Sequence, residues 1–218
     1  MREYLEILKT SGLFRGMKEE EILSILDCLG AEEGSFGKGE YLFRQGDEIH
    51  SIAVLLSGKV RIESTDFWGE RHILGVVVPG EIFAEAYALD GETILNDVIA
   101  EEKSTVLFLD VSKALRTCSS SCPFHTALID NLFCLVARKN RSLVQKISQV
   151  TRRSTREKVL SYLSDQAKRS GKDSFSIPFD RQALADYLAV DRSALSSVLS
   201  HLRDEKIIKF HKNEFKLL

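Results

Sequence analysis

Glycine is distributed very unevenly along this chain of 218 residues. Twelve of the 13 glycines lie between Gly12 and Gly91, and only Gly171 follows. Because glycine readily takes the left-handed backbone conformations that tight turns need, turns are expected to cluster early in the chain. The sequence therefore predicts a turn-rich first part and a second part in which helices dominate.

The turn-rich part begins with two helical segments and then changes to strands. Residues 2–10 and 18–29 carry apolar side chains at helical spacing. Between residues 34 and 111 the pattern changes to short β-rich runs separated by turn residues. Such runs are typical of an antiparallel sandwich or barrel, and not of a parallel sheet with crossover helices. We therefore expect an antiparallel β-roll of the jelly-roll type.

A long amphipathic helix is predicted over residues 121–150. Pro123 follows a run of serines and suits an early helical position. Apolar side chains then recur at steps of three, four or seven, with Lys139 and Asn140 interrupting the stripe. The stripe favours pairing with a second copy of the helix, with Asn140 fixing the register, while packing on the chain's own β-roll is the alternative. The residues expected at the dimer contact are Ile129, Leu132, Val136, Asn140, Leu143 and Ile147.

The last part of the chain has the pattern of a winged helix-turn-helix. One helix, a short strand, two short helices and a candidate terminal hairpin follow one another in the sequence. Asp180 can cap a helix over residues 181–188, and a tight turn follows at Ala189 and Val190. Asp191 can then cap the next helix.

Charge divides the chain in the same way. The formal net charge is −2, but residues 1–150 hold 16 Lys/Arg against 23 Asp/Glu, a net of −7, and residues 151–218 hold 14 against 9, a net of +5. A basic domain is the electrostatic signature of a nucleic-acid partner. We predict an α+β chain with a sensor β-roll and its short helices over 1–120, a dimerisation helix over 121–150 and a DNA-binding domain over 151–218.

The cellular location is expected to be the cytoplasm. The first residues lack the apolar core of a signal peptide, and no apolar run approaches the roughly 20 residues of a membrane helix. No membrane partner is therefore expected. Four cysteines are too few for a disulfide framework, and a cytoplasmic chain would keep them reduced.

The second helix of the helix-turn-helix has a polar outer face. Four apolar residues share its other side and are expected to face the core: Leu195, Val198, Leu199 and Leu202. A helix suits the major groove when its outer face lacks bulky apolar groups and carries hydrogen-bonding side chains. The candidate base-reading residues are Arg192, Ser193, Ser196, Ser197 and Ser200. The candidate phosphate contacts are Arg152, Arg153, Arg181, Lys209 and Lys212, together with Arg156 and Lys216.

Two segments of the sequence, taken in order, resemble a known family. The first part contains PGEIFAE after Gly39, Gly46 and Gly58, and the last part contains LADYLAVDRSALSSVLSHLRDEKII. With the long helix between them, they resemble the CRP/FNR superfamily of bacterial transcription regulators over essentially the whole chain. The resemblance implies a homodimer that binds double-stranded DNA at a two-fold symmetric operator, with RNA polymerase as a partner. It also implies an effector in a cyclic-nucleotide-binding-like β-roll that repositions the DNA-binding domains.

The effector region departs from the members of this family that bind cyclic AMP. Those members grip the nucleotide with a glycine–glutamate pair and a later arginine–serine pair. Here Ala84 replaces the glycine beside Glu85, and no Arg or Lys lies between Arg71 and Lys103. A buried phosphate without a cationic partner is costly, so cyclic AMP binding is not expected. A different small molecule could be bound by residues that could equally form the core of the roll: Phe83, Glu85, Tyr87, Ile94 and Leu95.

Thiol-based cofactors are not predicted either. The oxygen-sensing branch holds an iron–sulfur cluster with several cysteines near the N-terminus, where this chain has only Cys28. Cys118, Cys122 and His125 have loose ligand spacing, but three donors do not make a closed zinc site, and a structural role is favoured. No metal site is predicted, and a redox role for Cys118, Cys122 or Cys134 is left open.

Two histidines bear on the remaining alternatives. His50 and His72 match no motif of the haem-binding, carbon-monoxide-sensing branch, so haem is not expected. They also lack the paired H-x-H partner that a cupin-like metal enzyme needs, so an enzymatic function is not favoured. A regulator controlled by a small molecule or redox signal is favoured over a constitutive DNA-binding regulator that has lost its effector.

Overall fold

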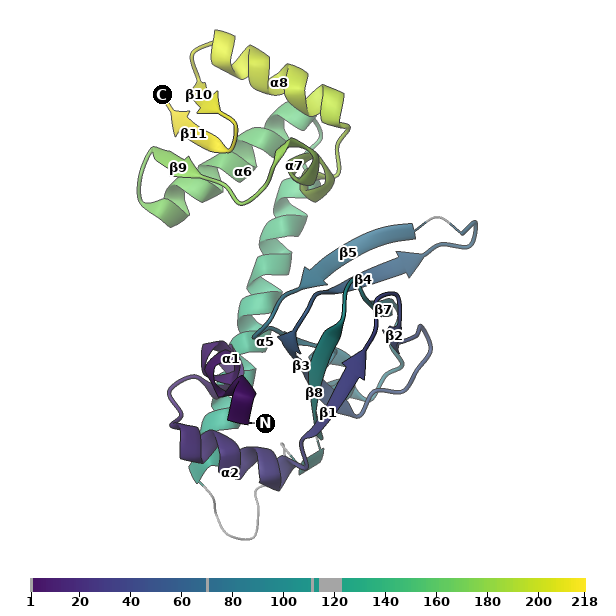
Figure 1. Ribbon diagram of the computed structural model, residues 1–218. Helices are drawn as coiled ribbons and strands as arrows, with labels where there is room; N and C mark the ends of the chain where they lie inside the picture. Colours follow the sequence, from purple (N-terminus) through teal and green to yellow (C-terminus); the bar gives the residue numbers. More distant parts are fainter. Residues whose placement is uncertain (1, 70, 111, 114–122) are drawn as a thin grey trace. The chain divides into compact units, whose positions relative to one another are not determined.

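The computed structural model, drawn in Figure 1, describes residues 2–69, 71–110, 112–113 and 123–218. The chain divides into two compact units, Met1–Ala137 and Arg138–Leu218. The boundary falls inside the long helix. The sequence-based division kept residues 121–150 as a separate part, whereas packing assigns the two ends of that segment to different units.

Short helices open the first unit, as the spacing of apolar residues predicted. They are η1 (Arg2–Tyr4), α1 (Leu5–Thr10), η2 (Gly12–Phe14) and α2 (Glu19–Leu29). The Lys18 N–H at the start of α2 donates to the Glu21 carboxylate. The helix ends at Gly30, whose φ of 61° is left-handed and favours glycine. One face of α2 joins the hydrophobic core of the unit.

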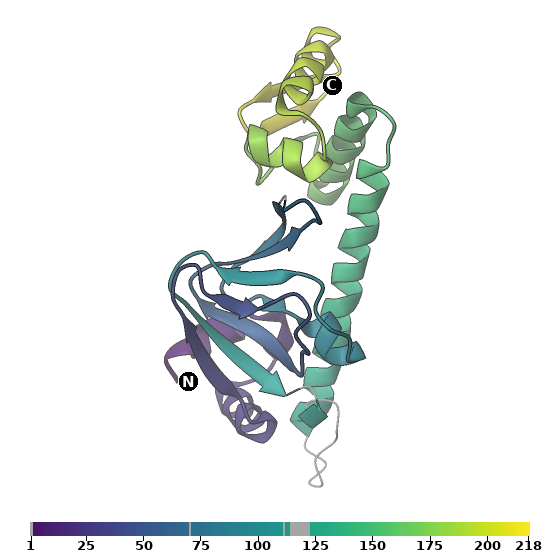
Figure 2. The same ribbon diagram turned by 90° about the vertical axis from the view of Figure 1, so that its right-hand side faces the viewer.

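Two four-stranded antiparallel sheets form the jelly roll that the strand pattern predicted (Figure 2). One sheet has the order β1-β8-β3-β6 and the other β2-β7-β4-β5. The strands are β1 (Glu32–Phe36), β2 (Tyr41–Phe43), β3 (Ser51–Ser57), β4 (Val60–Thr65), β5 (Arg71–Val77), β6 (Ile82–Phe83), β7 (Asp97–Ala100) and β8 (Ser104–Asp110). The central β3 carries an unbroken buried run, which is typical of a strand covered on both faces.

A short helix that the sequence did not predict follows β6. α3 (Glu85–Asp90) lies between two left-handed residues, Ala84 with φ 61° and Gly91 with φ 76°. An alanine in that conformation is strained relative to glycine. The sequence signal for α3 is weak because backbone conformation at its ends, and not a periodic apolar stripe, sets its bounds.

The long helix α5 runs from Pro123 to Val150, which confirms the helix predicted from the apolar stripe. Its first part packs into the core of the first unit through Phe124, Leu128 and Leu132. The Asn131 side-chain amide donates to the carbonyl oxygens of Leu13 and Arg15, at 3.1 and 2.9 Å.

The second unit is the winged helix-turn-helix that the sequence predicted. It contains α6 (Thr155–Ser170), β9 (Ser174–Ser176), α7 (Arg181–Leu188), α8 (Arg192–Asp204), β10 (Ile208–His211) and β11 (Glu214–Leu217). The strands form an antiparallel sheet of order β10-β11-β9. Leucines of α7 and α8 share one buried cluster with Val159 and Tyr162 of α6. This cluster fixes which face of α8 points outward.

Among the described residues, no helix is long and apolar enough to cross a membrane.

Candidate nucleic-acid interface

The helices α7 and α8 each begin at a carboxylate cap, as predicted. An Asp180 carboxylate oxygen accepts from the Ala183 N–H at 2.8 Å. At the turn, Ala189 takes a left-handed conformation with φ 50°. An Asp191 carboxylate oxygen then accepts from the N–H groups of Ser193 and Ala194, at 2.8 and 3.0 Å. These bonds satisfy donors at the start of each helix and fix the angle at which α8 begins.

A lysine that the sequence analysis missed supports the same turn. The Lys158 ammonium of α6 donates to the carbonyl oxygens of Leu188 and Ala189, at 3.2 and 3.1 Å. These carbonyls lie at the C-terminal end of α7, where a cation is also favoured by the helix dipole. Thirty residues separate Lys158 from Leu188 in sequence, so no local pattern could have revealed the contact.

The orientation of α8 agrees with the sequence prediction. Leu195, Leu199 and Leu202 are fully buried, and Val198 is half-buried against them. Arg192, Ser193, Ser196 and Ser197 are exposed, and Ser200 is half-buried. The outer face therefore carries one long cation and a row of hydroxyl groups.

Two of these serines are already engaged within the helix. The Ser193 hydroxyl donates to the Asp191 carboxylate at 2.5 Å, and the Ser196 hydroxyl donates to the Arg192 carbonyl at 2.9 Å. Hydrogen bonds from Ser193, first its hydroxyl, and from the Ala194 N–H lower the pKa of Asp191. Within the described chain, no hydrogen bond or ion pair holds the side chains of Arg192 and Ser197. We therefore rank Arg192 and Ser197 above Ser193 and Ser196 as base readers.

The candidate phosphate contacts form two groups: cations that are exposed, and cations whose side chains bond to other groups of the same unit. The exposed cations are Arg152, Arg153, Lys209, Lys212 and Lys216. Lys212 lies between β10 and β11 at the tip of the wing, with a left-handed φ of 53°. On the outer face of the wing sheet, Lys209 stands directly opposite Lys216. Like charges placed opposite one another repel, so an anion at this face would stabilise the pair.

Two of the predicted phosphate contacts are held inside the unit. The Arg156 guanidinium makes a two-pronged ion pair with Glu205, at 2.9 and 2.5 Å, which lowers the pKa of Glu205. Arg181 is half-buried, lies 5.1 Å from the Phe210 ring centroid and donates to the Lys212 carbonyl. Burial lowers the pKa of Arg181. Arg156 therefore neutralises Glu205 and Arg181 supports the wing, while a phosphate contact of either side chain stays a prediction.

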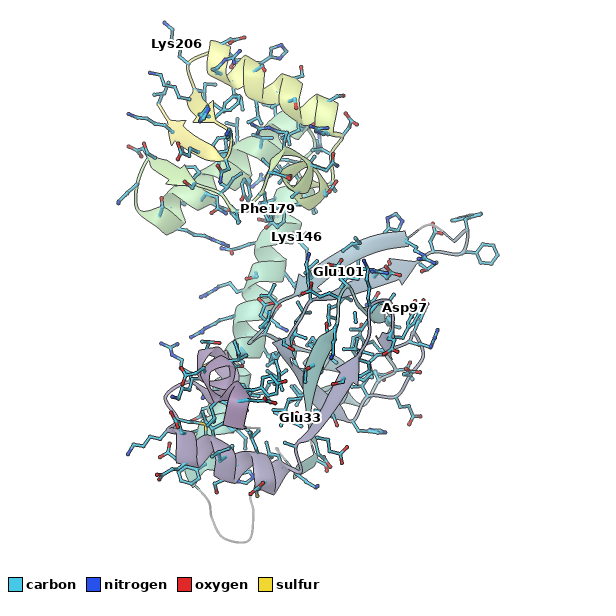
Figure 3. The ribbon with its side chains drawn as sticks, in the orientation of Figure 1. Glu33, Asp97, Glu101, Lys146, Phe179 and Lys206 are labelled. Carbon is cyan, nitrogen blue, oxygen red and sulfur yellow. The ribbon has the colours of Figure 1, made fainter. Side chains whose placement is uncertain are left out.

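Aromatic and polar side chains hold the end of α5 to the rest of the second unit (Figure 3). The Lys146 ammonium lies 5.4 Å from the Tyr187 ring centroid, and Tyr187 packs on Phe179 with centroids 4.9 Å apart. The Gln149 side-chain amide donates to the Asp165 carboxylate at 2.7 Å. The last turns of α5 are therefore part of the second unit.

The exposed stripe of α5 differs from the predicted one at one position. Leu132 is 4% exposed and belongs to the core of its own unit, so it cannot face a partner helix. Phe133, which the sequence analysis did not select, is 76% exposed. Val136, Leu143 and Ile147 are exposed as expected. Asn140 is also exposed, and Ile129 is half-buried. With Phe133 in place of Leu132, the stripe follows alternating steps of four and three, the spacing of a coiled-coil seam.

The candidate effector residues lie in two environments. Phe83 and Ile94 are buried in the hydrophobic core, and Glu85 is buried beside β6. Tyr87 is half-buried, and its hydroxyl accepts from the Asn96 amide at 3.3 Å. Leu95 is 63% exposed, and its assignment to an effector pocket stays a prediction. The burial of Phe83 and Ile94 favours core packing for these two side chains.

His50 and His72 are both exposed, and no group of three or more His, Cys, Asp or Glu side chains gathers within the described ranges. Cys118 and Cys122 lie outside the described residues. Cys134 is exposed on α5.

Two family models match the chain. The model of the cyclic nucleotide-binding domain matches residues 33–121, and that of the Crp-like helix-turn-helix domain matches residues 157–218. Together they cover the β-roll and the winged helix-turn-helix.

One known relative matches almost the whole chain, and another matches less than half of it. The Cyclic AMP receptor protein of Thermus thermophilus is 28% identical over 93% of this chain and 90% of its own length. The cGMP-dependent protein kinase 2 of Mus musculus is 30% identical over 46% of this chain. The match covers only 13% of the length of the kinase. Among solved structures, the Thermus thermophilus Catabolite Activator Protein has a TM-score of 0.53 at 24% identity, covering 95% of this chain and 94% of that one. This last likeness concerns the fold.

Proposed function

The chain belongs to the CRP/FNR superfamily of transcription regulators, and from this premise we propose that it binds double-stranded DNA as a homodimer under the control of an effector. The observation that carries the proposal is the outer face of α8, where Arg192 and serines are held outward by a buried leucine face. The family relationship and this polar face both favour a regulator over an enzyme.

Sequence-specific binding is assigned to the first turns of α8. Arg192 is the first residue of this helix, and in helix-turn-helix proteins the N-terminal residues of the second helix contact base edges. An arginine can bond both acceptors of a guanine, which is worth roughly 1–3 kcal/mol of discrimination. Ser197 adds a hydroxyl that can donate or accept, so its own contribution to specificity is smaller.

Affinity is assigned to the exposed cations of the second unit. Arg152, Arg153, Lys209 and Lys212 remain candidates for phosphate contacts, because their side chains are exposed. Each phosphate that a Lys or Arg side chain neutralises releases counterions from the DNA. The affinity for DNA should therefore fall steeply as the salt concentration rises. The acidic first part of the chain repels a phosphate backbone, which helps to orient the basic unit toward DNA.

Dimerisation is assigned to the exposed seam of α5. Phe133, Val136, Leu143 and Ile147 lie at coiled-coil spacing on one continuous helix, and Asn140 occupies a position within the same seam. A single asparagine at such a position fixes register at a cost in stability. A pair of chains related by a two-fold axis would present two α8 helices to a two-fold symmetric operator.

The effector is proposed to be a small molecule or redox signal other than cyclic AMP. No Arg or Lys lies between residues 71 and 103 to meet a cyclic phosphate, and Ala84 occupies a left-handed position where glycine would be unstrained. The alternative is a constitutive regulator, which the burial of Phe83 and Ile94 in the core also permits. As a transcription regulator the protein would act in the cytoplasm with RNA polymerase.

Selection of bound DNA from a random pool, with and without candidate effectors, tests this proposal. We expect enrichment of an inverted repeat, no response to cyclic AMP, and a change in affinity with at least one metabolite or oxidant. Constant affinity across the whole panel would favour the constitutive alternative. A selected pool without an inverted repeat would contradict the proposed dimeric reader.

A further inference from the structure

A thiol and an imidazole meet where α2 ends and α5 begins. Cys28 lies in the last turn of α2 and His125 in the first turn of α5. The Cys28 sulfur is 3.7 Å from His125 Nε2, a hydrogen-bonding distance for sulfur. Both residues belong to the first unit, so their contact is independent of the position of the second unit. The fold thus places a nucleophile beside a base from residues 97 positions apart.

The thiol is open to solvent, whereas the imidazole is buried behind it. Cys28 is exposed, so a small reagent in solution can reach its sulfur. His125 is 1% exposed, and its Nδ1 atom has no hydrogen-bond partner among the described residues. Its Nε2 atom faces the sulfur. A buried polar group that lacks partners costs free energy, and a redox or catalytic role is one of the standard reasons why native proteins keep one.

The imidazole is placed to turn the thiol into a thiolate. The thiolate is the nucleophilic form of cysteine, and an ordinary thiol is only a few per cent thiolate at about pH 7. Transfer of the Cys28 proton to His125 Nε2 gives a thiolate in contact with an imidazolium ion. The contact is partly buried, and opposite charges attract one another more strongly there than in bulk water. An adjacent base of this kind is a common means of activating a nucleophile.

The two helix ends beside the pair act in opposite directions. Cys28 lies at the C-terminal end of α2, where the helix dipole disfavours a thiolate and favours an imidazolium ion. His125 lies at the N-terminal end of α5, where the dipole has the reverse effect on both groups. Because these contributions offset one another, the direct contact between sulfur and Nε2 decides how reactive the thiol is.

We infer that Cys28 is a modification site, a thiol activated by His125 and oxidised by small hydroperoxides. A hydroperoxide suits the pair because its leaving oxygen needs a proton, which the imidazolium ion holds beside the sulfur. The site is separate from α8 and from the candidate effector residues of the β-roll, so its reactivity does not depend on the proposed function.

The oxidation step is a two-electron transfer from sulfur to the peroxide. The thiolate attacks the terminal hydroxyl oxygen of the peroxide, so an S–O bond forms while the O–O bond breaks. Sulfur is oxidised to a sulfenic acid and the peroxide is reduced. The leaving oxygen takes the proton of His125 Nε2 and departs as water or an alcohol, which returns the imidazole to its neutral form.

Alkylation of the reduced full chain by iodoacetamide tests the activation without any variant. Tandem mass spectrometry follows the adduct at each cysteine with time. Cys134 is the matched control, because it is a second exposed thiol of the same unit. At about pH 7, Cys28 should react roughly tenfold faster than Cys134, and the two rates should converge in urea. Equal rates in the folded chain, or a difference that persists in urea, would overturn the inference.

Hydrogen peroxide with dimedone, which traps sulfenic acids, tests the oxidation and the role of the imidazole. Wild type should form the dimedone adduct at Cys28 faster than at Cys134. In His125→Gln, which keeps a polar side chain but cannot take the proton, formation at Cys28 should slow roughly tenfold while the rate at Cys134 stays unchanged. An undiminished rate at Cys28 in His125→Gln would overturn the role of the imidazole. A wild-type chain without an adduct at Cys28 would overturn the assignment of the oxidant.

Discussion

The exposed faces of α5 and α8 have opposite chemistry. The outer face of α8 carries Arg192 and serines, whereas that of α5 carries Phe133, Leu143 and Ile147. Both helices bury leucines on another side, so the difference does not come from how they are held. Water solvates a polar face well, but an apolar stripe gains free energy when it is covered. The exposed face of α8 therefore suits a charged, polar partner, and that of α5 suits an apolar one.

The largest effect is expected from a charge in the apolar seam. In Leu143→Glu, a carboxylate would have to be buried between two copies of α5, so we expect a monomer. DNA affinity should then fall on the order of 100-fold or more, because one chain loses the advantage of binding two half-sites together. Light scattering and fluorescence anisotropy measure both results. Ser142→Glu adds the same charge beside the seam and should remain dimeric; equal losses in both variants would remove the case for an apolar seam.

A smaller effect is expected from the polar face. Arg192→Ala should weaken specific binding by roughly 1–3 kcal/mol and affect non-specific binding much less. Lys209→Ala is the comparison, because a phosphate contact should lower both affinities alike and reduce the salt slope by about 1. Titration of specific and random duplexes over a range of salt separates the two patterns. If Arg192→Ala behaved like Lys209→Ala, Arg192 would be a phosphate contact only.

Lys158 supports the turn that precedes α8, and we expect it to affect the stability of the protein more than its binding to DNA. Lys158→Met removes the ammonium that bonds to the Leu188 and Ala189 carbonyls while keeping the length of the side chain. We expect a loss of about 1 kcal/mol in the free energy of unfolding. Lys172→Met removes an exposed cation beyond the other end of α6 and should change the free energy of unfolding little. Urea unfolding gives both values, and equal stability of the two variants would mean that Lys158 does not hold the turn.

The smallest effect concerns the cap of α8 and depends on pH. Because hydrogen bonds lower the pKa of Asp191 in the folded chain, its stabilisation is present above the ordinary carboxyl pKa of about 4 and is lost as the pH falls through the lowered value. The difference in Tm between wild type and Asp191→Ala should therefore shrink in acid. The Asn side chain of Asp191→Asn can cap the helix but does not titrate. The difference in Tm between Asp191→Asn and Asp191→Ala should therefore persist in acid. A wild-type advantage that did not change with pH would contradict the role of the carboxylate.

Local signals predicted the polar face well. Asp180 and Asp191 are short polar residues just before two helices, and such residues cap helices by bonding to backbone a few positions away. The buried leucines follow from the helical period alone. The inward and outward sides of α8 could therefore be assigned without tertiary information.

The structural features that the sequence did not predict depend on contacts between segments that lie far apart in the chain. Leu132 and Phe133 are adjacent, and each fits a helical apolar stripe, so only packing on the β-roll decides which one is left exposed. The pairs Arg156–Glu205 and Cys28–His125 join residues 49 and 97 positions apart. No periodicity or spacing in a single sequence encodes these pairs.

Sedimentation velocity of the chain alone and with its selected duplex tests whether the apolar face of α5 pairs two chains and the polar face of α8 binds DNA. We expect two chains in free solution and two chains on one duplex. Leu143→Glu should sediment as one chain, while Arg192→Ala should remain a dimer that leaves the duplex more readily. A wild-type chain that sediments as a monomer and binds the duplex one to one would contradict both roles.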